Sequence, residues 1–420
     1  MQLIEPPIDK VMFYSHDTYG LGHLRRTLTL ANDLRARMPS TSQLIITGSP
    51  VADGFPYPEG ADYIKLPSVV KTGAGHYKSR SIAISFEELR DMRSEILLSA
   101  ARYFQPDALI VDHAPAGLKG EVVPTLSYLK KHSPRTKLVV GLRDIVDEAP
   151  QVRRAWAQEG AYELFDDVYD LILVYGHKHL YDPVTEYGLS PRAAAKTCFV
   201  GYLGRERSTR TREEVRASLP LQTNRLVVVT AGGGGDGNAL FEAVLMGLRQ
   251  RSDPVDFDCL LVGGPLMPHT DRLRLKKMAN GQTMVHFLDF TEEMTSYLGA
   301  ADVVVSMGGY NSVCEILSLG RPSVIVPRVI PRKEQLIRAG ALSQLGLVRM
   351  IHPDDLSAER IMDAVHGLLA EPAGRRPQIR MDGLHGVAKA LRSVLPPATP
   401  LREPALVYGP FDAAPAAVLA

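Results

Sequence analysis

Two glycine-rich turns in the second half of the chain have the composition of a phosphate site. The first, Ala231-Gly-Gly-Gly-Gly-Asp-Gly237, follows the apolar run 226–230 and precedes a helical pattern over residues 238–249. Glycine has no Cβ atom to hold a diphosphate away from the backbone N–H groups, so we expect a phosphate cradle here, with a permissive strand-to-helix turn as the alternative. No Gly-Lys-Ser/Thr follows, so the segment is not a Walker loop and an ATPase is disfavoured. The candidate phosphate ligands are Gly233, Gly234 and Gly235.

The second turn, Met307-Gly-Gly-Tyr-Asn-Ser312, links the apolar run 303–306 to a helix start that contains Glu315. Asn311 and Ser312 can cap this helix or donate hydrogen bonds to an anion. Glu315 lies about one helical turn further along the same face, where a carboxylate can accept both hydroxyls of a ribose. A solvated first-turn glutamate, favoured by the helix dipole, is the alternative interpretation.

A resemblance to the MurG-type glycosyltransferases is carried by residues 290–335, which read FTEEMTSYLGAADVVVSMGGYNSVCEILSLGRPSVIVPRVIPRKEQ. That family has the GT-B fold and adds N-acetylglucosamine to the peptidoglycan lipid intermediate. The resemblance covers the second half of the chain, but in the first half only the opening loop. It implies that Glu315 holds the ribose and that the backbone at Thr291 reads the uracil. The residues it places near the diphosphate are Gly308, Gly309 and Ser312.

The same resemblance places Gln335, with Glu334 beside it, where the family contacts the hydroxyls of the donor sugar. The family's His-Gln or Asp-Gln pair is replaced here by Arg332-Lys333-Glu334-Gln335, so the identity of the sugar stays open. Arg328, Arg332 and Lys333 either help to stabilise a leaving diphosphate or form a basic surface turn.

The first half opens on the apolar run 11–14, followed by Ser15-His-Asp-Thr-Tyr-Gly-Leu-Gly-His23 and a helical pattern. The resemblance places His23 where MurG-like enzymes carry Gly-Gly-His between their domains. Sugar transfer needs a base for the acceptor hydroxyl, and a neutral imidazole is suited to this task. His23 is therefore the candidate base, with ordering of the loop or phosphate binding as the alternative. The same acceptor-side loop contains His16, a weaker candidate base, and the glycines Gly20 and Gly22.

Asp112 follows the apolar run 108–111 and is expected at the same edge of the sheet as His23. A carboxylate beside an imidazole fixes its tautomer, although an aspartate ending a strand is often only a turn-former. A metal cluster is not expected, because its possible members lack a fixed ligand spacing: His16, Asp17, His23, Asp112 and His113. Asp256-Phe-Asp258 matches a metal-binding DxD pattern, but it begins a strand at the wrong end. We expect no bound metal and no cofactor.

Short β-branched runs alternate with longer amphipathic segments, which predicts an α/β fold with parallel sheets covered by helices. The polar segment 204–212 (GRERSTRTR) is the predicted linker. We expect two Rossmann-like domains facing a cleft, the GT-B arrangement, with an acceptor-side domain at 1–205, a donor domain at 206–396 and a Pro/Ala-rich tail at 397–420. The predicted strands are 11–14, 44–47, 63–66, 108–111, 138–141, 171–174 and 198–201, then 226–230, 257–262, 284–287, 303–306, 323–326 and 348–350.

Composition excludes several classes of partner. The 420 residues include 48 basic and 47 acidic side chains, so charge alone recruits no nucleic acid. Three well-separated cysteines predict neither a disulfide framework nor a zinc site, and they fit a reducing cytoplasm. No apolar stretch approaches bilayer length. We therefore expect a cytoplasmic protein that does not span a membrane, with a peripheral membrane contact left open.

The combined hypothesis is an inverting, metal-independent transfer from a nucleotide sugar, expected to be UDP-linked, to an acceptor hydroxyl. The acceptor is a glycan, a lipid or a small molecule, and the basic, glycine-containing segment 69–85 is a candidate acceptor loop. Two alternatives keep the fold: a nucleotide-sugar 2-epimerase and a non-catalytic nucleotide-binding protein. A dinucleotide oxidoreductase is disfavoured, because neither half has Gly-x-Gly-x-x-Gly with an acidic residue about twenty positions later.

Overall fold

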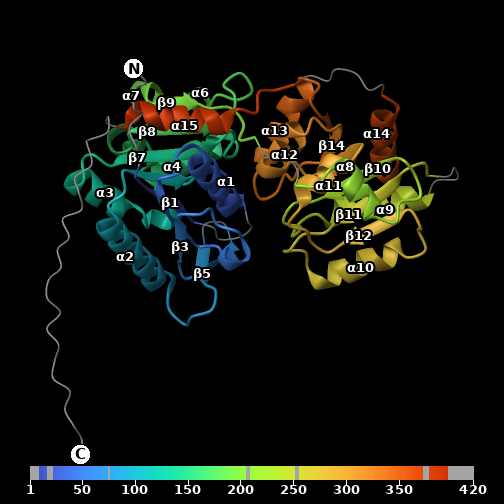
Figure 1. Ribbon diagram of the computed structural model, residues 1–420, viewed down its shortest axis with the longest axis horizontal. Coiled ribbons are helices and arrows are strands. Elements are labelled where there is room, and N and C mark those ends of the chain that lie inside the picture. Colours follow the sequence, from blue (N-terminus) through green and yellow to red (C-terminus); the bar gives the residue numbers. More distant parts are fainter. Residues whose placement is uncertain are drawn as a thin grey trace, which may run out of the picture.

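Two parallel sheets, each covered by helices on both faces, form the computed structural model (Figure 1). It describes residues 9–16, 22–73, 76–204, 209–250, 255–371 and 378–395. Gly20, Asp17, the middle of the predicted linker and the Pro/Ala-rich tail lie outside these residues. The α/β prediction with two Rossmann-like sheets is confirmed.

The first sheet has the order β3-β2-β1-β6-β7-β8-β9, with all pairs parallel. Side chains alternate along β1, with Val11 and Phe13 on one face and Met12 and Tyr14 on the other. Each predicted strand of the first half is present. The strands are β1 (Lys10–Ser15), β2 (Ser42–Thr47), β3 (Ala61–Lys65), β6 (Ala108–Asp112), β7 (Lys137–Arg143), β8 (Leu171–Tyr175) and β9 (Thr197–Phe199).

Helices bury apolar side chains against both faces of this sheet. The face of Val11 and Phe13 is covered by α1 (Gly22–Arg37). The face of Met12 is covered by α2 (Phe86–Phe104), α3 (Val123–His132) and α4 (Ala149–Gln158). A capping box between Ser85 and Glu88 fixes the start of α2.

The second sheet has the order β12-β11-β10-β13-β14-β15, also all parallel. One face packs against α9 (Asn238–Gln250), α10 (His269–Ala279) and α14 (Ala358–Ala370). The other packs against α8 (Arg212–Ala217), α11 (Met294–Ala300), α12 (Tyr310–Ser318) and α13 (Glu334–Gln344). The strands are β10 (Leu226–Thr230), β11 (Asp258–Val262), β12 (Val285–Leu288), β13 (Val303–Ser306), β14 (Ser323–Ile325) and β15 (Arg349–Met350).

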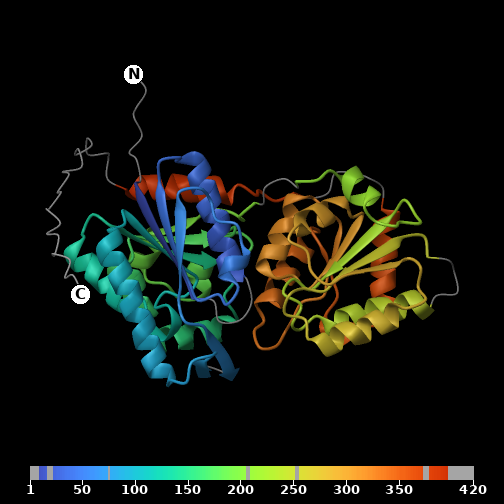
Figure 2. The ribbon, with the colours of Figure 1, turned by 60° about the horizontal axis from the view of Figure 1, so that its bottom comes forward.

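The last helix, α15 (Gly383–Val394), returns to the first sheet, although the predicted donor range 206–396 includes it. Val387 and Leu391 on α15 join the core formed by α1 and β8, and Figure 2 shows the helix lying across that domain. The range 206–396 therefore spans elements of both domains. Sequence order did not reveal this, because an amphipathic helix at the chain end fits either sheet.

Segment 69–85, predicted as a loop, instead begins with an antiparallel hairpin of β4 (Val69–Gly73) and β5 (His76–Ser79). In the described ranges, no helix is long and apolar enough to cross a membrane.

Candidate active site

Both sheets reverse their strand order beside the central strand, between β1 and β6 and between β10 and β13. Ligands of open α/β sheets bind outside the carboxyl ends of the strands at such switch points. The segments with His16, His23 and Asp112 follow β1 and β6, and the two glycine turns follow β10 and β13. Topology therefore places every principal candidate at a switch point.

His23, Arg26 and Asp112 form one hydrogen-bonded cluster. Nδ1 of His23 lies 2.6 Å from Asp112 Oδ2, and Arg26 donates from Nε and Nη2 to both carboxylate oxygens at 2.7 and 2.6 Å. Burial by itself would raise the pKa of Asp112, but the charge of Arg26 and the hydrogen bond from His23 outweigh it, so the pKa lies well below its usual range. An ionised Asp112 accepts the Nδ1 proton of His23 and leaves Nε2 with a lone pair. This is the tautomer that a base requires.

Two further histidines lie next to this cluster, and their imidazole rings are held neutral. The rings of His16 and His113 lie 4.4 and 5.4 Å from that of His23. Burial lowers the pKa of both imidazoles well below its usual value. Arg143 lies 3.0 Å from Nε2 of His113, and burial lowers the pKa of Arg143 to about 10. His113 has a φ of 67°, uncommon outside glycine, where β6 ends at the site.

The two glycine turns of the second domain lie against each other. A Cβ atom added to Gly232 would lie 3.5 Å from Ser312 Oγ. Gly234 has a φ of 86°, and a Cβ there would lie 2.4 Å from the carbonyl oxygen of Gly263. Gly308 has a φ of 80° and would meet Ile325 at 2.7 Å. Both turns therefore require glycine at these positions, and Gly232 of the first turn lies beside Ser312 in the first turn of α12.

Glu315 is buried and lies at the boundary between the domains. Arg25 of α1 donates from Nη2 to Glu315 Oε1 at 2.6 Å, and the Glu315 side chain is only 2% exposed. One turn earlier on α12, Asn311 donates from Nδ2 to the carbonyl oxygen of Gly22 at 3.2 Å. The first turns of α1 and α12 are thus docked together, with Glu315 directed at the acceptor-side domain.

Glu334 and Gln335 are buried at the start of α13. Arg328 donates to Glu334 Oε1 at 2.9 Å and also to Asp236 at 2.9 Å. Within the described residues, Oε2 of Glu334 is buried and has no hydrogen-bond partner. Gln335 accepts the backbone N–H of Arg328, and its Nε2 lies 3.9 Å from a Cβ added to Gly309. This pair borders the second glycine turn and leaves one buried acceptor for a ligand hydroxyl.

A second interdomain contact lies directly behind that turn. Arg338 of α13 donates from Nε and Nη2 to Asp144 at 2.7 Å each, and both side chains are at most 2% exposed. Tyr202 donates to the same carboxylate at 2.8 Å. Tyr310 lies between two guanidinium groups, those of Arg26 and Arg338, 5.7 and 5.6 Å from its ring centre. Figure 1 shows α12 and α13 on the side of the second domain that faces α1.

We expect Arg338→Met to destabilise the protein by about 3–5 kcal/mol, because it leaves the carboxylate of Asp144 buried without its cation. For a domain of this size, that corresponds to a fall of roughly 10 °C in the first thermal transition. The matched control is Lys333→Met, which removes an exposed interdomain pair with Glu148. It is expected to cost less than about 1 kcal/mol. Equal losses in differential scanning calorimetry would show that the buried pair does not hold the domains together.

The structure brings together His16, His23, Asp112, Asn311 and Glu315 through the contacts above, and Gly22 with them. Thr291 lies apart from that contact network and accepts the backbone N–H of Glu293, so its contact with uracil stays a prediction. Asp258 is buried at the start of β11, where it accepts the backbone N–H groups of Gln222 and Thr223. Over the ranges described above, no three His, Cys, Asp or Glu side chains are grouped to hold a metal ion.

Several residues of this site had no prediction from sequence, among them Arg25, Arg26, Asp144 and Arg338. A usable signal existed for Asp144, because it follows a strand as Asp112 does, but the predicted strand 138–141 stops before the observed end of β7 at Arg143. The arginines carry no such signal, since each finds its carboxylate far away in the sequence.

Comparisons with known proteins bear on the second domain and on the fold. Residues 227–393 match the glycosyltransferase family 28 C-terminal domain. A relative from Alkaliphilus metalliredigens, UDP-N-acetylglucosamine–N-acetylmuramyl-(pentapeptide) pyrophosphoryl-undecaprenol N-acetylglucosamine transferase, is 25% identical over 185 residues, 44% of this chain and 50% of the relative. The chain thus spans about half the length of the curated relatives it matches.

Two solved structures share the arrangement of both domains. MurG of Acinetobacter baumannii has a TM-score of 0.53 and 15% identity, covering 93% of this chain and 96% of that one. UDP-GlcNAc 2-epimerase of Neisseria meningitidis, bound to UDP-GlcNAc, has a TM-score of 0.59 and 13% identity, covering 91% and 100%. At these identities the likeness establishes the fold alone.

Proposed function

The chain has the GT-B fold with a MurG-like second domain of the glycosyltransferase family 28 type, and from this premise we propose that it transfers a sugar from a UDP-sugar to an acceptor hydroxyl. The observation that carries the proposal is the docking of α1 on α12. It places the His23–Asp112 pair, through Gly22 and Arg25, beside the segment with Asn311 and Glu315. Base and nucleotide site therefore belong to one interface.

In the proposed reaction, the acceptor oxygen attacks the anomeric carbon as the bond from that carbon to the diphosphate oxygen breaks. The bonding electron pair leaves with the diphosphate, and the acceptor proton passes to Nε2 of His23. Asp112 stabilises the imidazolium that forms, while Arg26 keeps Asp112 ionised. A single displacement inverts the anomeric centre.

On the donor side, Glu315 would accept the ribose hydroxyls and the two glycine turns would hold the diphosphate. The N-termini of α9 and α12 offer unpaired N–H groups and a partial positive charge, which is the role a metal has in other sites. Arg25 occupies Oε1 of Glu315, and in the proposed complex ribose takes its place. Oε2 of Glu334 is the buried acceptor available to a sugar hydroxyl, and Gln335 is next to it.

A thermal-shift screen of nucleotides and nucleotide sugars tests this proposal. We expect UDP and at least one UDP-sugar to raise the unfolding temperature, since a ligand at one hundred times its Kd stabilises by about 2.7 kcal/mol. CMP and ADP serve as controls for recognition of the nucleobase. Stabilisation by adenine nucleotides with none by UDP compounds would contradict the proposed donor.

A further inference from the structure

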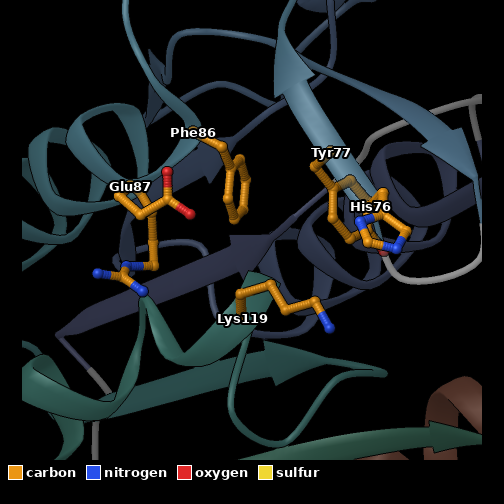
Figure 3. A pocket seen from close by; sticks show the side chains of 6 residues that line it. His76, Tyr77, Phe86, Glu87 and Lys119 are labelled. Atoms are coloured by element: carbon orange, nitrogen blue, oxygen red, sulfur yellow. The ribbon is translucent and has the colours of Figure 1, made fainter.

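A hollow of ≈ 540 Å³ between the β4–β5 hairpin and the start of α2 is distinct from the candidate active site (Figure 3). Figure 3 shows Lys119 beneath two aromatic rings there, and the lining includes neither His23 nor Asp112. A cation that is joined to the site lies elsewhere, at Arg143, where β7 ends. Arg143 is hydrogen-bonded to His113, whose ring lies 5.4 Å from that of His23. Arg143, and not the hollow, therefore belongs to the surroundings of the candidate base.

Arg143 has no negative partner, although it is only partly exposed. Its Nη2 donates to Nε2 of His113 at 3.0 Å, and in the part of the chain that the structure describes no carboxylate pairs with it. Its Nε is buried and has no hydrogen-bond partner there. A guanidinium has five N–H groups, so one imidazole leaves most of them unused. Because removing a cation from water is costly without a counter-charge, this arrangement favours the binding of an anion.

Three arginines that are fully buried show which partner a guanidinium takes in this protein. Each donates from Nε and Nη2 to a single carboxylate, at 2.6 or 2.7 Å. Arg143 instead has an imidazole on Nη2, and its Nε is without a partner among the described residues. It therefore lacks the pair of anionic oxygens that those arginines bind, and a phosphoryl group offers such a pair. The three pairs are Arg26–Asp112, Arg93–Glu121 and Arg338–Asp144.

His113 does not supply the missing negative charge and is itself short of a partner. Its Nε2 accepts from Arg143, so the proton of the neutral imidazole is on Nδ1. That Nδ1 is buried and has no hydrogen-bond partner in the described ranges. Nδ1 of His16, whose ring lies 4.4 Å from that of His23, is buried without a partner in the same ranges. Unmatched polar atoms thus lie on two histidines beside the candidate base, next to the unpaired guanidinium.

The segment that follows Arg143 contacts the donor side. Asp144, the next residue, binds Arg338, whose Nη1 donates to a carbonyl oxygen of the second glycine turn at 3.2 Å. Glu334, at the start of α13, is bound to Arg328 at 2.9 Å and not to Arg143. Arg143 therefore lies where the first domain meets the second glycine turn, between the candidate base and the proposed diphosphate site.

We propose that Arg143 is an anion subsite that binds a phosphoryl group between the domains, with His113 fixing the orientation of its guanidinium. The phosphoryl group has two possible sources with the same chemistry: the β-phosphate of the nucleotide donor, and a phosphate on the acceptor. The planar guanidinium can donate to two phosphate oxygens at once. The choice between the two sources rests on the proposed sugar transfer, whereas binding of the anion does not.

Isothermal titration of the full chain and of Arg143→Met with UDP, UMP and inorganic phosphate tests this assignment and separates the two sources. If the group is the β-phosphate of the donor, we expect Arg143→Met to raise Kd for UDP about tenfold or more. Kd for UMP, which lacks that phosphate, should stay within about twofold. If the group belongs to the acceptor, both nucleotides bind as in the wild type. Inorganic phosphate then binds to the UDP-saturated wild type but not to the UDP-saturated variant.

Arg321→Met is the matched control for this variant. Arg321 is also partly exposed, and in the described residues its buried Nε has no partner, but it precedes β14 at the opposite edge of the second sheet. We expect Arg321→Met to bind all three ligands as the wild type does.

The stability of Arg143→Met distinguishes a binding arginine from a structural one. We expect its ligand-free unfolding temperature to be unchanged or raised, because the substitution removes an unpaired cation. A fall like that expected for Arg338→Met would overturn the proposal. So would equal weakening of UDP and UMP binding, or unchanged nucleotide affinities in a chain where phosphate binding is absent or independent of Arg143. Phosphate binding that depends on Arg143 in a chain that binds no UDP would retain the anion site and refute the proposed donor.

Discussion

Replacing His23 by Gln lowers the rate of sugar transfer by about 10²- to 10⁴-fold, the range that general-base catalysis contributes, and leaves Kd for UDP within about twofold of its wild-type value. Glutamine retains an N–H that can donate to Asp112, but it cannot take up the proton of the acceptor hydroxyl. The His23 side chain is 20% exposed and therefore open to a substrate, unlike Asp112 at 3%. Release of UDP in the presence of the acceptor is the measurement.

His16→Gln is the matched control for this variant, because its ring lies 4.4 Å from that of His23 but has no contact with Asp112 among the described hydrogen bonds. We expect it to lower the rate far less. A larger loss in His16→Gln than in His23→Gln would assign the base to His16. Loss of UDP binding in His23→Gln would assign His23 to the donor instead.

Glu315→Gln raises Kd for UDP by about 10- to 100-fold, because hydrogen bonds to a charged acceptor contribute about 1.5–3 kcal/mol each. Arg25→Met tests the role of the same carboxylate by removing its ion-pair partner. It removes the cation that ribose must displace, so we expect it to bind UDP at least as tightly as the wild type. Unchanged UDP affinity in Glu315→Gln would show that the ribose binds elsewhere.

Most of the fold could be predicted from sequence because strand and helix signals are local. Runs such as 226–230 and 303–306 are built around three consecutive valines, and each is followed by a glycine turn that starts a helix. Parallel topology then places those turns at one edge of the sheet, so the approach of Gly232 to Ser312 follows from local patterns. The neighbouring positions of His23 and Asp112 could be predicted in the same way.

The contacts that join the two domains could not be predicted, since they depend on the docking of separately folded units. Arg25 and Glu315 are 290 residues apart, and Arg338 and Asp144 are 194 apart. Nothing near either arginine in the sequence indicates a buried carboxylate partner. The return of α15 to the first sheet has the same origin, because its apolar face is compatible with either domain.

The central claim is that the protein transfers a sugar from UDP to an acceptor at the interface between its domains, and following the donor sugar in D₂O tests it most directly. Protein is incubated in D₂O with a UDP-sugar that stabilises it, with and without acceptor, and the sugar is followed by NMR. We predict an unchanged donor without acceptor, and UDP with an inverted glycoside when acceptor is present. An epimer at C2, or solvent deuterium incorporated there without acceptor, would contradict sugar transfer and identify a 2-epimerase.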